Sequence, residues 1–507
     1  MKKRVISLLC VIISIAIALR IYRLGDRNLW HDEIFAIFFH RFSFPDITRV
    51  LIRAPLHIVV VNIVTRLFYR NEFWTRLPAM IFGCASIPFV YLLGKRLFNR
   101  HVGLVGAFLL AISPFHIWYS QTAVRYTQAV FFITLSSYLF ICCVREDKNW
   151  LWIIFSFIQI MAVYTSYLSF IMIVPQMAIL FLLERGKYVK KLVLSWSVVI
   201  LFFLPWVTTF LHQISSLYEN FWIPDTKLFF IYATLCNFNL GFTVTTQMFF
   251  ISFVFWLSIF VFSLLPGCKE YRQSLVVTLL FCLLPIVSIF IISLWWKAIY
   301  LSRLMILFLP FYLLIISFGI YRINKTVYKM IVLCIIALFT SISLRNYYLD
   351  RMPAPSDYRV GTYIKKPFEP MIQFIKDNFQ EGDKVVVTSS NLDLPLWYYW
   401  GDEYRNEALY FMDPNTHDEY FKKAYSKRYT AGLYLSRGSG PDPVVDISRD
   451  PQLPYKRMWV LSSNWARDGD IDENSRAVRY WLEKRFHIIL NKDFQGILVT
   501  LYAPGED

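Results

Sequence analysis

Residues 4–21 read RVISLLCVIISIAIALRI, an apolar segment that directly follows Lys2 and Lys3. The hydrocarbon core of a bilayer takes roughly 20 apolar residues of α-helix, so this segment can span it. Similar segments recur at about residues 76–98, 102–120, 127–144, 190–210, 246–266, 273–294, 300–320 and 328–344. The stretch 150–183 is too long for one span and is interrupted at residues 164–167, which indicates two short helices. The sequence therefore predicts a polytopic α-helical membrane protein with about 11 transmembrane helices.

The composition agrees with a membrane protein. Of 507 residues, 57% are hydrophobic and 17% are charged, whereas a soluble domain carries about 25% charged residues. The formal net charge is +17, but the basic residues mostly occupy short gaps between apolar segments. That placement indicates orientation in a bilayer rather than binding to nucleic acid. We therefore expect the lipid bilayer as a partner and no nucleic acid.

The same basic gaps predict the topology. The apolar segment from Pro55 to Phe68 is short, and could cross the membrane or lie in its interface. If it lies in the interface, all of the basic gaps fall on one side, which the positive-inside rule assigns to the cytoplasm. These gaps hold Lys2 to Arg4, Lys95, Arg96 and Arg100, Arg145 and Lys148, Arg185 to Lys191, Lys269 and Arg272, and Arg322, Lys325 and Lys329. We expect an interfacial segment 55–68, a cytoplasmic N-terminus and an extracytoplasmic C-terminal region.

Two domains follow from this topology: a transmembrane domain, residues 1–344, and an extracytoplasmic soluble α/β domain, residues 345–507. The first contains external loops at about residues 22–75 and 211–245. In the second, Gly382-Asp383 precedes the apolar run at residues 385–387, and no cysteine follows Cys334, so it is expected to fold without disulfides. The predicted strands are Val385–Val387, Met458–Leu461 and Ile497–Tyr502, and the predicted helices are Pro370–Phe379 and Asp472–Phe486.

The first external loop contains an acidic pair, Asp32 and Glu33, in the sequence Trp30-His31-Asp32-Glu33. An apolar run begins directly after it at Ile34, so the carboxylates should be partly buried at the membrane surface. Because burying carboxylates at a membrane is unfavourable, a functional role is one hypothesis. The alternative is helix capping, since acidic residues complement the dipole at a helix N-terminus. The residues alone leave both readings open.

The order of several motifs resembles one membrane family. Trp-x-Asp-Glu after the first span is followed by Ala54-Pro55-Leu56-His57, by Asn71-Glu72-x-x-x-Arg76-Leu77-Pro78-Ala79 at the start of the next helix, and by Ser113-Pro114-Phe115-His116-x-x-Tyr119-Ser120-Gln121. This order is similar to that in bacterial relatives of dolichyl-phosphate-mannose–protein mannosyltransferases. These belong to the GT-C class (glycosyltransferase family 39-type), which includes the aminoarabinose transferases that modify lipid A. The resemblance is strongest over residues 15–130.

The resemblance implies a function and a location. It implies an inverting glycosyltransferase of a bacterial cell membrane, with a polyprenyl-phosphate-linked monosaccharide as donor and a glycan, lipid or protein hydroxyl as acceptor. It implies that Asp32 and Glu33 carry catalysis, with Asp32 as the general base. Ala16-Ile17-Ala18 also resembles a signal-peptide cleavage site. We favour an uncleaved first helix, and cleavage would leave the downstream topology unchanged.

Four cations are candidates for binding the donor phosphate, because a guanidinium fork or an ammonium can stabilise a leaving phosphate. Arg53 lies where relatives place a basic residue near the carrier phosphate. Arg303 and Lys297 lie at the external end of the tenth span, and Arg125 at that of the third. At the position of Arg303, relatives often carry Arg-Tyr, whereas this chain has Arg303-Leu304. Before Arg125, relatives often carry Ser-Gln-Glu-Ala-Arg, whereas in this chain Thr122 replaces the glutamate. The alternative for each is a charge that snorkels at a helix end.

The candidate substrate pocket is formed by His31, His57, Gln121 and Tyr126, with a polar helix terminus as the alternative for the last two. No histidine spacing indicates a metal site, so we expect no bound metal and no certain cofactor. The acidic pair could nevertheless use a divalent cation, Mg²⁺ or Mn²⁺.

Two rival functions remain. A transporter or flippase of lipid-linked glycans would also use many spans and interfacial cations, but transporters tend to show repeats and charges at the bilayer midplane. Here the charges gather at helix ends. A catalytically inactive binding scaffold is the third reading, and the intact acidic pair argues against it. No nucleotide-binding fingerprint is present, which fits a lipid-linked donor.

Overall fold

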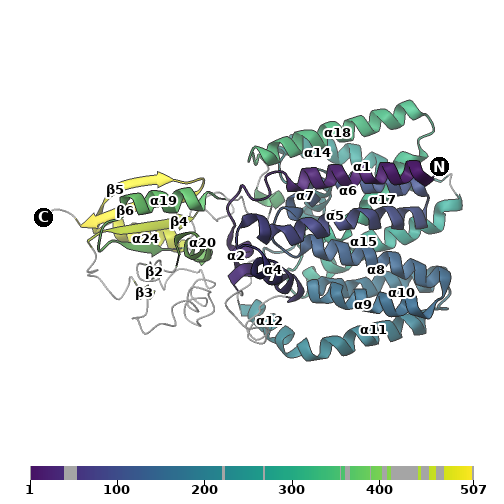
Figure 1. The fold of residues 1–507 in the computed structure, drawn as a ribbon, viewed down its shortest axis with the longest axis horizontal. Helices are drawn as coiled ribbons and strands as arrows, with labels where there is room; N and C mark the ends of the chain where they lie inside the picture. The colour runs from purple at the N-terminus through teal and green to yellow at the C-terminus, as the bar shows by residue number, and fades with distance from the viewer. Residues whose placement is uncertain are drawn as a thin grey trace. The chain divides into compact units, whose positions relative to one another are not determined.

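The computed structural model describes residues 2–38, 54–219, 223–266, 269–353, 356–359, 366–388, 390–401, 408–412, 444–446, 456–463 and 473–504. The chain forms two compact units (Figure 1). Unit 1 contains residues 1–24, 42–213 and 223–362, and unit 2 contains residues 25–41, 214–222 and 363–507. The segment after the first apolar helix therefore belongs to the same unit as the C-terminal region.

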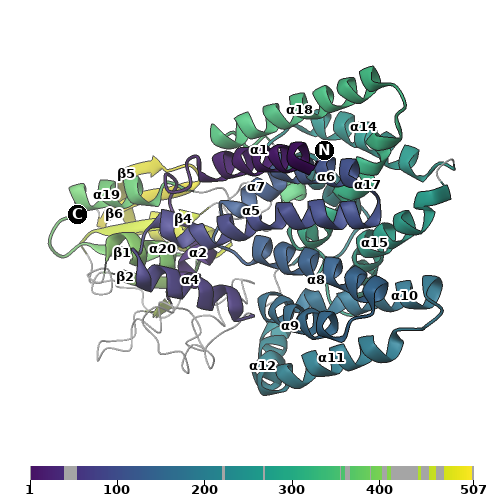
Figure 2. The same cartoon turned by 45° about the vertical axis from the view of Figure 1, so that its right-hand side comes forward.

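Unit 1 is a bundle of apolar helices (Figures 1 and 2). Among the described residues, eight helices are long and apolar enough to cross a bilayer, or nine if the bent pair α6–α7 is one span. Their bounds are α1 Lys2–Ile21, α5 Glu72–Leu97, α6 Arg100–Ile112, α7 Pro114–Ser120, α8 Tyr126–Glu146, α11 Val189–Phe203 continued by α12 Val207–Glu219, α14 Thr246–Leu264, α15 Arg272–Trp295, α16 Ser302–Met305 continued by α17 Leu309–Arg322, and α18 Thr326–Tyr348.

Shorter apolar helices complete the bundle. They are α4 Leu56–Leu67, α9 Asn149–Thr165, α10 Ile173–Leu183 with the 3-10 turn before it, and α13 Phe229–Leu240. Helices α9 and α10 confirm the two short helices that the interruption at residues 164–167 predicts. The polytopic helical fold class is confirmed, while the total of eleven crossings stays a prediction.

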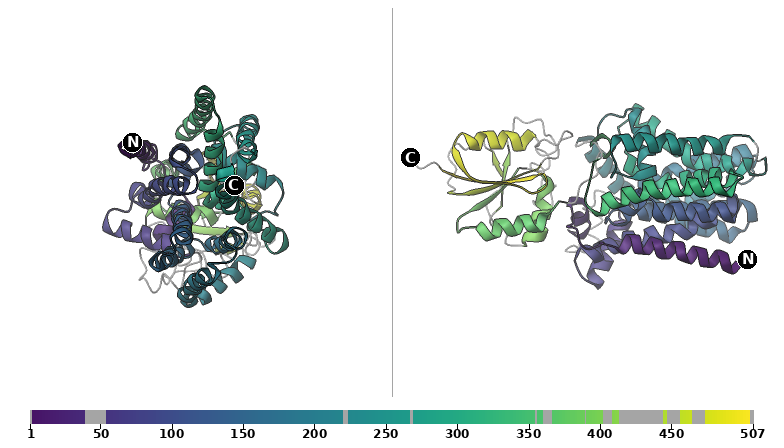
Figure 3. Two further views of the ribbon diagram at one scale, coloured as in Figure 1. Left: turned by 90° about the vertical axis from the view of Figure 1, so that its right-hand side faces the viewer. Right: turned by 90° about the horizontal axis from the view of Figure 1, so that it is seen from above.

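Burial separates central from peripheral helices in unit 1. In the most apolar part of the span made by α16 and α17, 89% of the residues are buried. The corresponding shares are 17% for α1 and 22% for α18. Because exposed apolar side chains in a membrane protein face lipid, α1 and α18 are among the lipid-facing helices and α17 belongs to the core. Helices α5 and α6 approach closely at glycines, since a Cβ added to Gly94 would lie 2.8 Å from the Cα of Gly103. The left panel of Figure 3 shows the helices of the bundle end-on.

Helix α4 has polar side chains on its buried side and large apolar side chains on its exposed side. His57, Asn62 and Thr65 are buried together with Ile58 and Val61, whereas Ile63 and Leu67 are 43% and 72% exposed. On a soluble protein, large apolar side chains such as these would face the core. The arrangement supports lipid contact along the exposed side, as expected for the interfacial segment 55–68.

Unit 2 contains a six-stranded mixed sheet of strand order β3-β2-β1-β4-β6-β5. Strands β3, β2, β1 and β4 are parallel, and β6 and β5 run antiparallel to them. The bounds are β1 Lys384–Val387, β2 Ala408–Met412, β3 Val444–Asp446, β4 Met458–Ser463, β5 Phe486–Asp493 and β6 Ile497–Pro504, and the helices are α19 Phe368–Asn378, α20 Ser390–Trp400 and α24 Glu473–Glu483. All three predicted strands and both predicted helices are confirmed.

Alternation along the strands directs side chains to the two faces of the sheet. Val386, Val460 and Tyr502 form one buried cluster with Val478 and Leu482 of α24. On the other face, Phe374 of α19 packs edge-on against Trp459 at 6.2 Å between ring centroids. Figure 3, right panel, shows the helices on opposite sides of the sheet.

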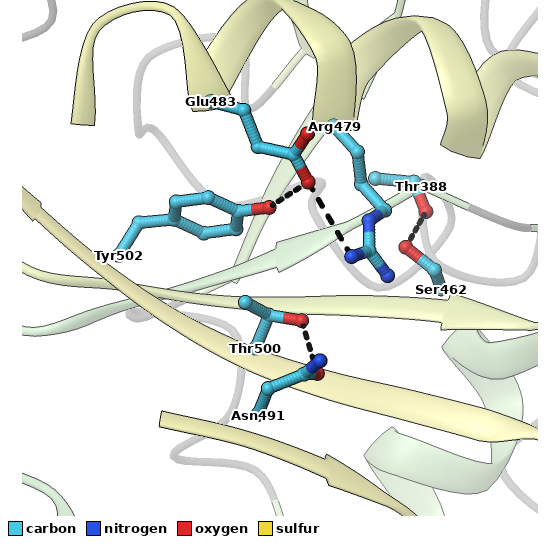
Figure 4. A network of polar contacts seen from close by, with 7 residues as sticks. All are labelled: Thr388, Ser462, Arg479, Glu483, Asn491, Thr500 and Tyr502. Atoms are coloured by element: carbon cyan, nitrogen blue, oxygen red, sulfur yellow. Dashed lines mark hydrogen bonds and ion pairs between the residues drawn. The ribbon is translucent and has the colours of Figure 1, made fainter. Parts of the chain in front are cut away.

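Polar side chains continue the α24 face of the sheet (Figure 4). The hydroxyl of Tyr502 donates to Glu483 at 3.3 Å, and Arg479 forms an ion pair with the same carboxylate at 3.4 Å. Burial raises the pKa of Tyr502 to about 12, so its hydroxyl stays protonated at neutral pH. Two further contacts in Figure 4 join Thr500 to Asn491 at 3.0 Å and Thr388 to Ser462 at 3.4 Å.

Candidate functional site

The acidic pair lies in the first turn of α2, His31–Phe38, which belongs to unit 2. Ile34, Ile37 and Phe38 are buried, and the ring of Phe38 packs edge-on against Trp397 of α20 at 5.6 Å. The backbone N–H of Leu29, just before the helix, donates to the hydroxyl of Tyr399 at 2.6 Å. The apolar run that follows the acidic pair thus fixes α2 on α20.

The two carboxylates of the pair have different surroundings. Glu33 is fully buried, and its Oε2 accepts a hydrogen bond from the backbone N–H of Trp30 at 3.3 Å. Trp30 directly precedes the helix and Glu33 is its third residue, so this bond is the backward half of a capping box. Asp32 is partly exposed. The capping alternative therefore describes Glu33, and Asp32 is the member of the pair with access to a reactant. The catalytic roles of both stay predictions. His31, the first residue of α2, is also partly exposed.

In unit 1, the chain bends by 58° between α6 and α7, at the predicted external end of the bundle. Ser113 and Pro114 cause the break. The hydroxyl of Ser113 accepts from the backbone N–H of His116 at 3.4 Å as an N-cap, and Pro114 is the first residue of α7. Proline is favoured there because it lacks the N–H that a helix start leaves unpaired. A helix end leaves carbonyls of its last turn without i+4 partners, and at the end of α6 the N–H of Ser113 bonds to the carbonyl of Leu110, at 3.4 Å.

Arg20, near the end of α1, forms hydrogen bonds with groups on both sides of this break. It is fully buried, and each of its five N–H groups has an acceptor. The acceptors are Ser120 Oγ for Nε at 3.1 Å, the oxygens of Ala16 and Ala111 for Nη1 at 3.1 and 2.8 Å, and Leu110 O and His116 Nδ1 for Nη2 at 3.1 and 2.9 Å. Sequence reasoning missed Arg20, although a charge at the end of an apolar helix is a usable signal.

Gln121 links three helix ends. Its Nε2 donates to the carbonyls of Arg20 and Tyr22 at 2.8 and 2.6 Å, and its Oε1 accepts from the hydroxyl of Tyr347 at 2.7 Å. These contacts hold the end of α7 against the ends of α1 and α18. Gln121 is 2% exposed, so its described contacts are structural and its place in a substrate pocket stays a prediction.

Arg125 and Tyr126 follow at the start of α8. Arg125 is partly buried and its guanidinium lies over the ring of Tyr126, 5.6 Å from the centroid. The ring of Tyr126 in turn packs edge-on against Tyr119 of α7 at 4.8 Å. The Tyr126 ring therefore fixes the position of the Arg125 charge, at the end of the bundle where α7 ends.

His57 contacts α8 from α4. It is 5% exposed, and its Nδ1 lies 3.2 Å from Oε1 of Gln128. An amide oxygen only accepts, so Nδ1 carries the proton in this contact. Gln128, which sequence reasoning did not single out, is 1% exposed.

The remaining predicted cations are Arg303, Lys297 and Arg53, and the structure describes the first two. Arg303 is 9% exposed and lies in α16, directly after Ser302, whose hydroxyl lies 3.2 Å from that of Thr234. Lys297 is partly buried in the connection between α15 and α16. Arg53 lies outside the described residues. Among the described residues, no group of three His, Cys, Asp or Glu side chains could hold a metal ion, and the use of Mg²⁺ or Mn²⁺ stays a prediction.

The candidate residues therefore fall into two groups. His31, Asp32 and Glu33 belong to unit 2. His57, Gln121, Arg125, Tyr126, Lys297 and Arg303 belong to unit 1. Within unit 1, the hydrogen bonds of Arg20 hold α6 and α7 at their break and so position the segment that carries Arg125. Helix α13 contacts the segment that carries Arg303 through Thr234 and Ser302.

Comparison with known proteins supports the predicted resemblance. Residues 53–211 match the family described as dolichyl-phosphate-mannose-protein mannosyltransferase. The Bacillus subtilis (strain 168) protein YkcB, which its name provisionally assigns to the mannosyltransferases, is 24% identical over 211 residues. That match covers 38% of this chain and 29% of YkcB, so it spans less than a third of the relative.

Solved structures match the whole fold. ArnT from Cupriavidus metallidurans bound to undecaprenyl phosphate has a TM-score of 0.63 at 11% identity, with 97% of both chains covered. The archaeal oligosaccharyltransferase AglB from Archaeoglobus fulgidus, in complex with an inhibitory peptide and a dolichol-phosphate, has a TM-score of 0.55 at 12% identity. That match covers 100% of this chain and 74% of AglB. At these identities the likeness concerns the fold, and the chain has the GT-C fold that the family resemblance implies.

Proposed function

We propose that this chain, a membrane protein with the GT-C fold, transfers a monosaccharide from a polyprenyl-phosphate-linked donor to an acceptor hydroxyl at the extracytoplasmic face of a bacterial cell membrane. The observation that carries the proposal is the similarity over 97% of both chains to a structure that binds undecaprenyl phosphate. The family match over residues 53–211 makes mannose the first sugar to test.

In this proposal Asp32 is the general base. Its carboxylate accepts the proton of the acceptor hydroxyl while the acceptor oxygen forms a bond to the anomeric carbon. The bond from that carbon to the phosphate oxygen breaks, and the polyprenyl phosphate leaves with the bonding electrons. A single displacement of this kind inverts the anomeric configuration. General-base assistance is typically worth about 10²–10⁴ in rate. The partial exposure of Asp32 supports this role, since a base must reach its reactant.

Cations of unit 1 would stabilise the charge that develops on the leaving phosphate. Arg303 and Arg125 are the first candidates, because a guanidinium can bind two phosphate oxygens at once. Lys297 would contribute a single point charge, and Arg53 a further guanidinium. His57, Gln121 and Tyr126 of unit 1 and His31 of unit 2 are the candidates for contact with the sugar or the acceptor. The transfer requires no metal in this scheme, and an added chelator tests that expectation.

The test is sugar transfer in proteoliposomes with a panel of labelled polyprenyl-phosphate monosaccharides. Wild type is compared with Asp32→Asn, and Asp26→Asn serves as the matched control, because Asp26 is an exposed carboxylate six residues earlier. We expect transfer or carrier-sugar hydrolysis by wild type and Asp26→Asn, and loss of at least about 100-fold in Asp32→Asn.

Other outcomes separate the alternatives. Equal turnover in wild type and Asp32→Asn would remove Asp32 from the mechanism. Movement of a lipid-linked sugar across the bilayer, without bond cleavage for any donor, would show the transporter or flippase function instead.

A further inference from the structure

A short 3-10 turn after α18, Ser356–Arg359, is fixed to the membrane helices of unit 1. Tyr358 is 7% exposed and belongs to a buried cluster with residues of α13 and α14. Its ring stacks on Phe249 with 4.6 Å between centroids and 7° between planes. Its backbone carbonyl accepts a hydrogen bond from Nδ2 of Asn237 at 2.8 Å. The turn is therefore a defined part of unit 1.

The helices around this turn place it at the lipid-facing rim. Phe249 is in the first turn of α14, so Tyr358 packs only about 5 Å below the start of that span. Helices α14 and α18 are 28% and 22% buried, and lie side by side at the edge of the bundle (Figures 1 and 2). A side chain beside the start of a lipid-facing span lies at the depth of lipid head groups.

Arg359 is the last residue of the turn and is partly buried there. Within the part of the chain that the structure describes, its guanidinium forms no hydrogen bond and no ion pair, and the nearest acidic residue in sequence, Asp357, is exposed. Burial lowers the pKa of Arg359, in agreement with a guanidinium that has lost part of its water. Arginine still remains protonated in proteins, so a partly buried guanidinium is stabilised by an anion.

We propose that Arg359 binds the phosphate group of a membrane lipid at the rim formed by α13, α14 and α18. The guanidinium fork matches phosphate oxygens, and lipid phosphates occur at this depth. The phosphate could belong to a polyprenyl phosphate or to a bulk phospholipid. The proposal requires only insertion in a membrane and is independent of glycosyl transfer.

The test is lipid binding to the purified full-length protein in detergent, measured by native mass spectrometry. The probes are undecaprenyl phosphate, phosphatidylglycerol and, without a phosphate, undecaprenol. The variants are Arg359→Gln and Arg359→Lys, and the matched control is Arg351→Gln, because Arg351 is an exposed arginine in the same connection. Thermal unfolding of each variant checks the fold. We expect Arg359→Gln to weaken binding of at least one phosphate probe by about tenfold or more, with an intermediate effect for Arg359→Lys.

Each outcome decides the proposal. A loss confined to undecaprenyl phosphate identifies a carrier site, and a loss for both phosphate probes identifies a general head-group site. Unchanged binding of both phosphate probes by folded Arg359→Gln overturns the proposal. An equal loss in Arg351→Gln, or an equal loss for undecaprenol, also overturns it, because the effect would then reflect net charge or apolar contact.

Discussion

Nη2 of Arg20 donates to Nδ1 of His116 at 2.9 Å, and both side chains are fully buried in unit 1. Arginine has no acceptor atom, so Nδ1 of His116 accepts and the proton of the neutral imidazole is on Nε2. The same guanidinium also binds the last carbonyls of α6, at Leu110 and Ala111. The pair therefore joins α1, α6 and α7 at the point where the chain changes direction.

This geometry predicts a graded effect of substitutions at His116. His116→Asn keeps an acceptor near the position of Nδ1, whereas His116→Leu leaves a buried N–H of Arg20 without one. An unsatisfied buried donor costs about 1–3 kcal/mol, so His116→Leu should lower the unfolding temperature in detergent more than His116→Asn. An equal loss in the two variants would show that ring volume, and not the hydrogen bond, determines stability here.

Gly83 provides the room for the same cluster. A Cβ at this position would lie 2.3 Å from Oγ and 3.0 Å from Cβ of Ser120. Overpacking of this kind typically costs about 1–3 kcal/mol, so Gly83→Ala should destabilise unit 1. The double variant Gly83→Ala/Ser120→Gly removes the clashing atoms, and should be more stable than the sum of the two single effects predicts. Strict additivity in thermal unfolding would contradict this account.

Local patterns in the sequence were sufficient to predict most of the helices and the central strands. Apolar runs of about 20 residues locate spans because, within a single segment, only a helix pairs its own backbone groups in lipid, and all the predicted spans correspond to described helices. Strand β5 was missed because its residues are mostly exposed, which removes the alternation that marks a half-buried strand. The three-residue strand β3 is too short for any such pattern.

The candidate site was less predictable, because its residues depend on contacts between distant segments. Nothing near Gln121 in the sequence reveals that its amide binds the carbonyls of Arg20 and Tyr22. The assignment of residues 25–41 to unit 2 also depends on tertiary packing of α2 against α20. The acidic pair itself was visible, since two carboxylates before an apolar run are unusual, but only the structure distinguishes Glu33 from Asp32.

Lys366 in unit 2 predicts a pH dependence. It is 9% exposed and donates to Ser463 Oγ at 3.1 Å and to the carbonyl of Gly496 at 2.7 Å. Burial lowers its pKa from 10.5 to about 8. Between these values the unfolded chain binds more protons than the folded chain, so this lysine makes stability rise with pH from about 8 to 10.5. Below pH 8 it is charged in both states and its burial is fully unfavourable.

Hydrogen exchange of β4 and β6 in the full-length protein measures this effect. The protection of these strands should increase between pH 8 and 10 more in wild type than in Lys366→Met, after correction for intrinsic exchange. Tyr502, with a raised pKa of about 12, acts in the opposite direction only above about pH 10. The same slope in wild type and Lys366→Met would exclude Lys366 as its source.

The acidic pair should separate into a capping residue and a reactive residue when each is replaced by its amide. Glu33→Gln retains an oxygen that can accept from the N–H of Trp30, and glutamine serves in capping boxes, so this variant should keep the stability of α2 and most of the activity. Glu33→Ala should destabilise the helix by about 0.5–1.5 kcal/mol. Asp32→Asn should leave stability unchanged and reduce transfer by about 10²–10⁴.

Thermal unfolding and sugar transfer of these three variants, measured on the same preparations, distinguish the roles. Retained transfer in Glu33→Gln together with lost transfer in Asp32→Asn would assign proton transfer to Asp32, and would leave Glu33 to hold the first turn of α2. The reverse pattern would assign the base to Glu33. Its full burial would then require α2 to move from its position on α20 before the acceptor could bind, because a buried carboxylate has no path to a hydroxyl from solution.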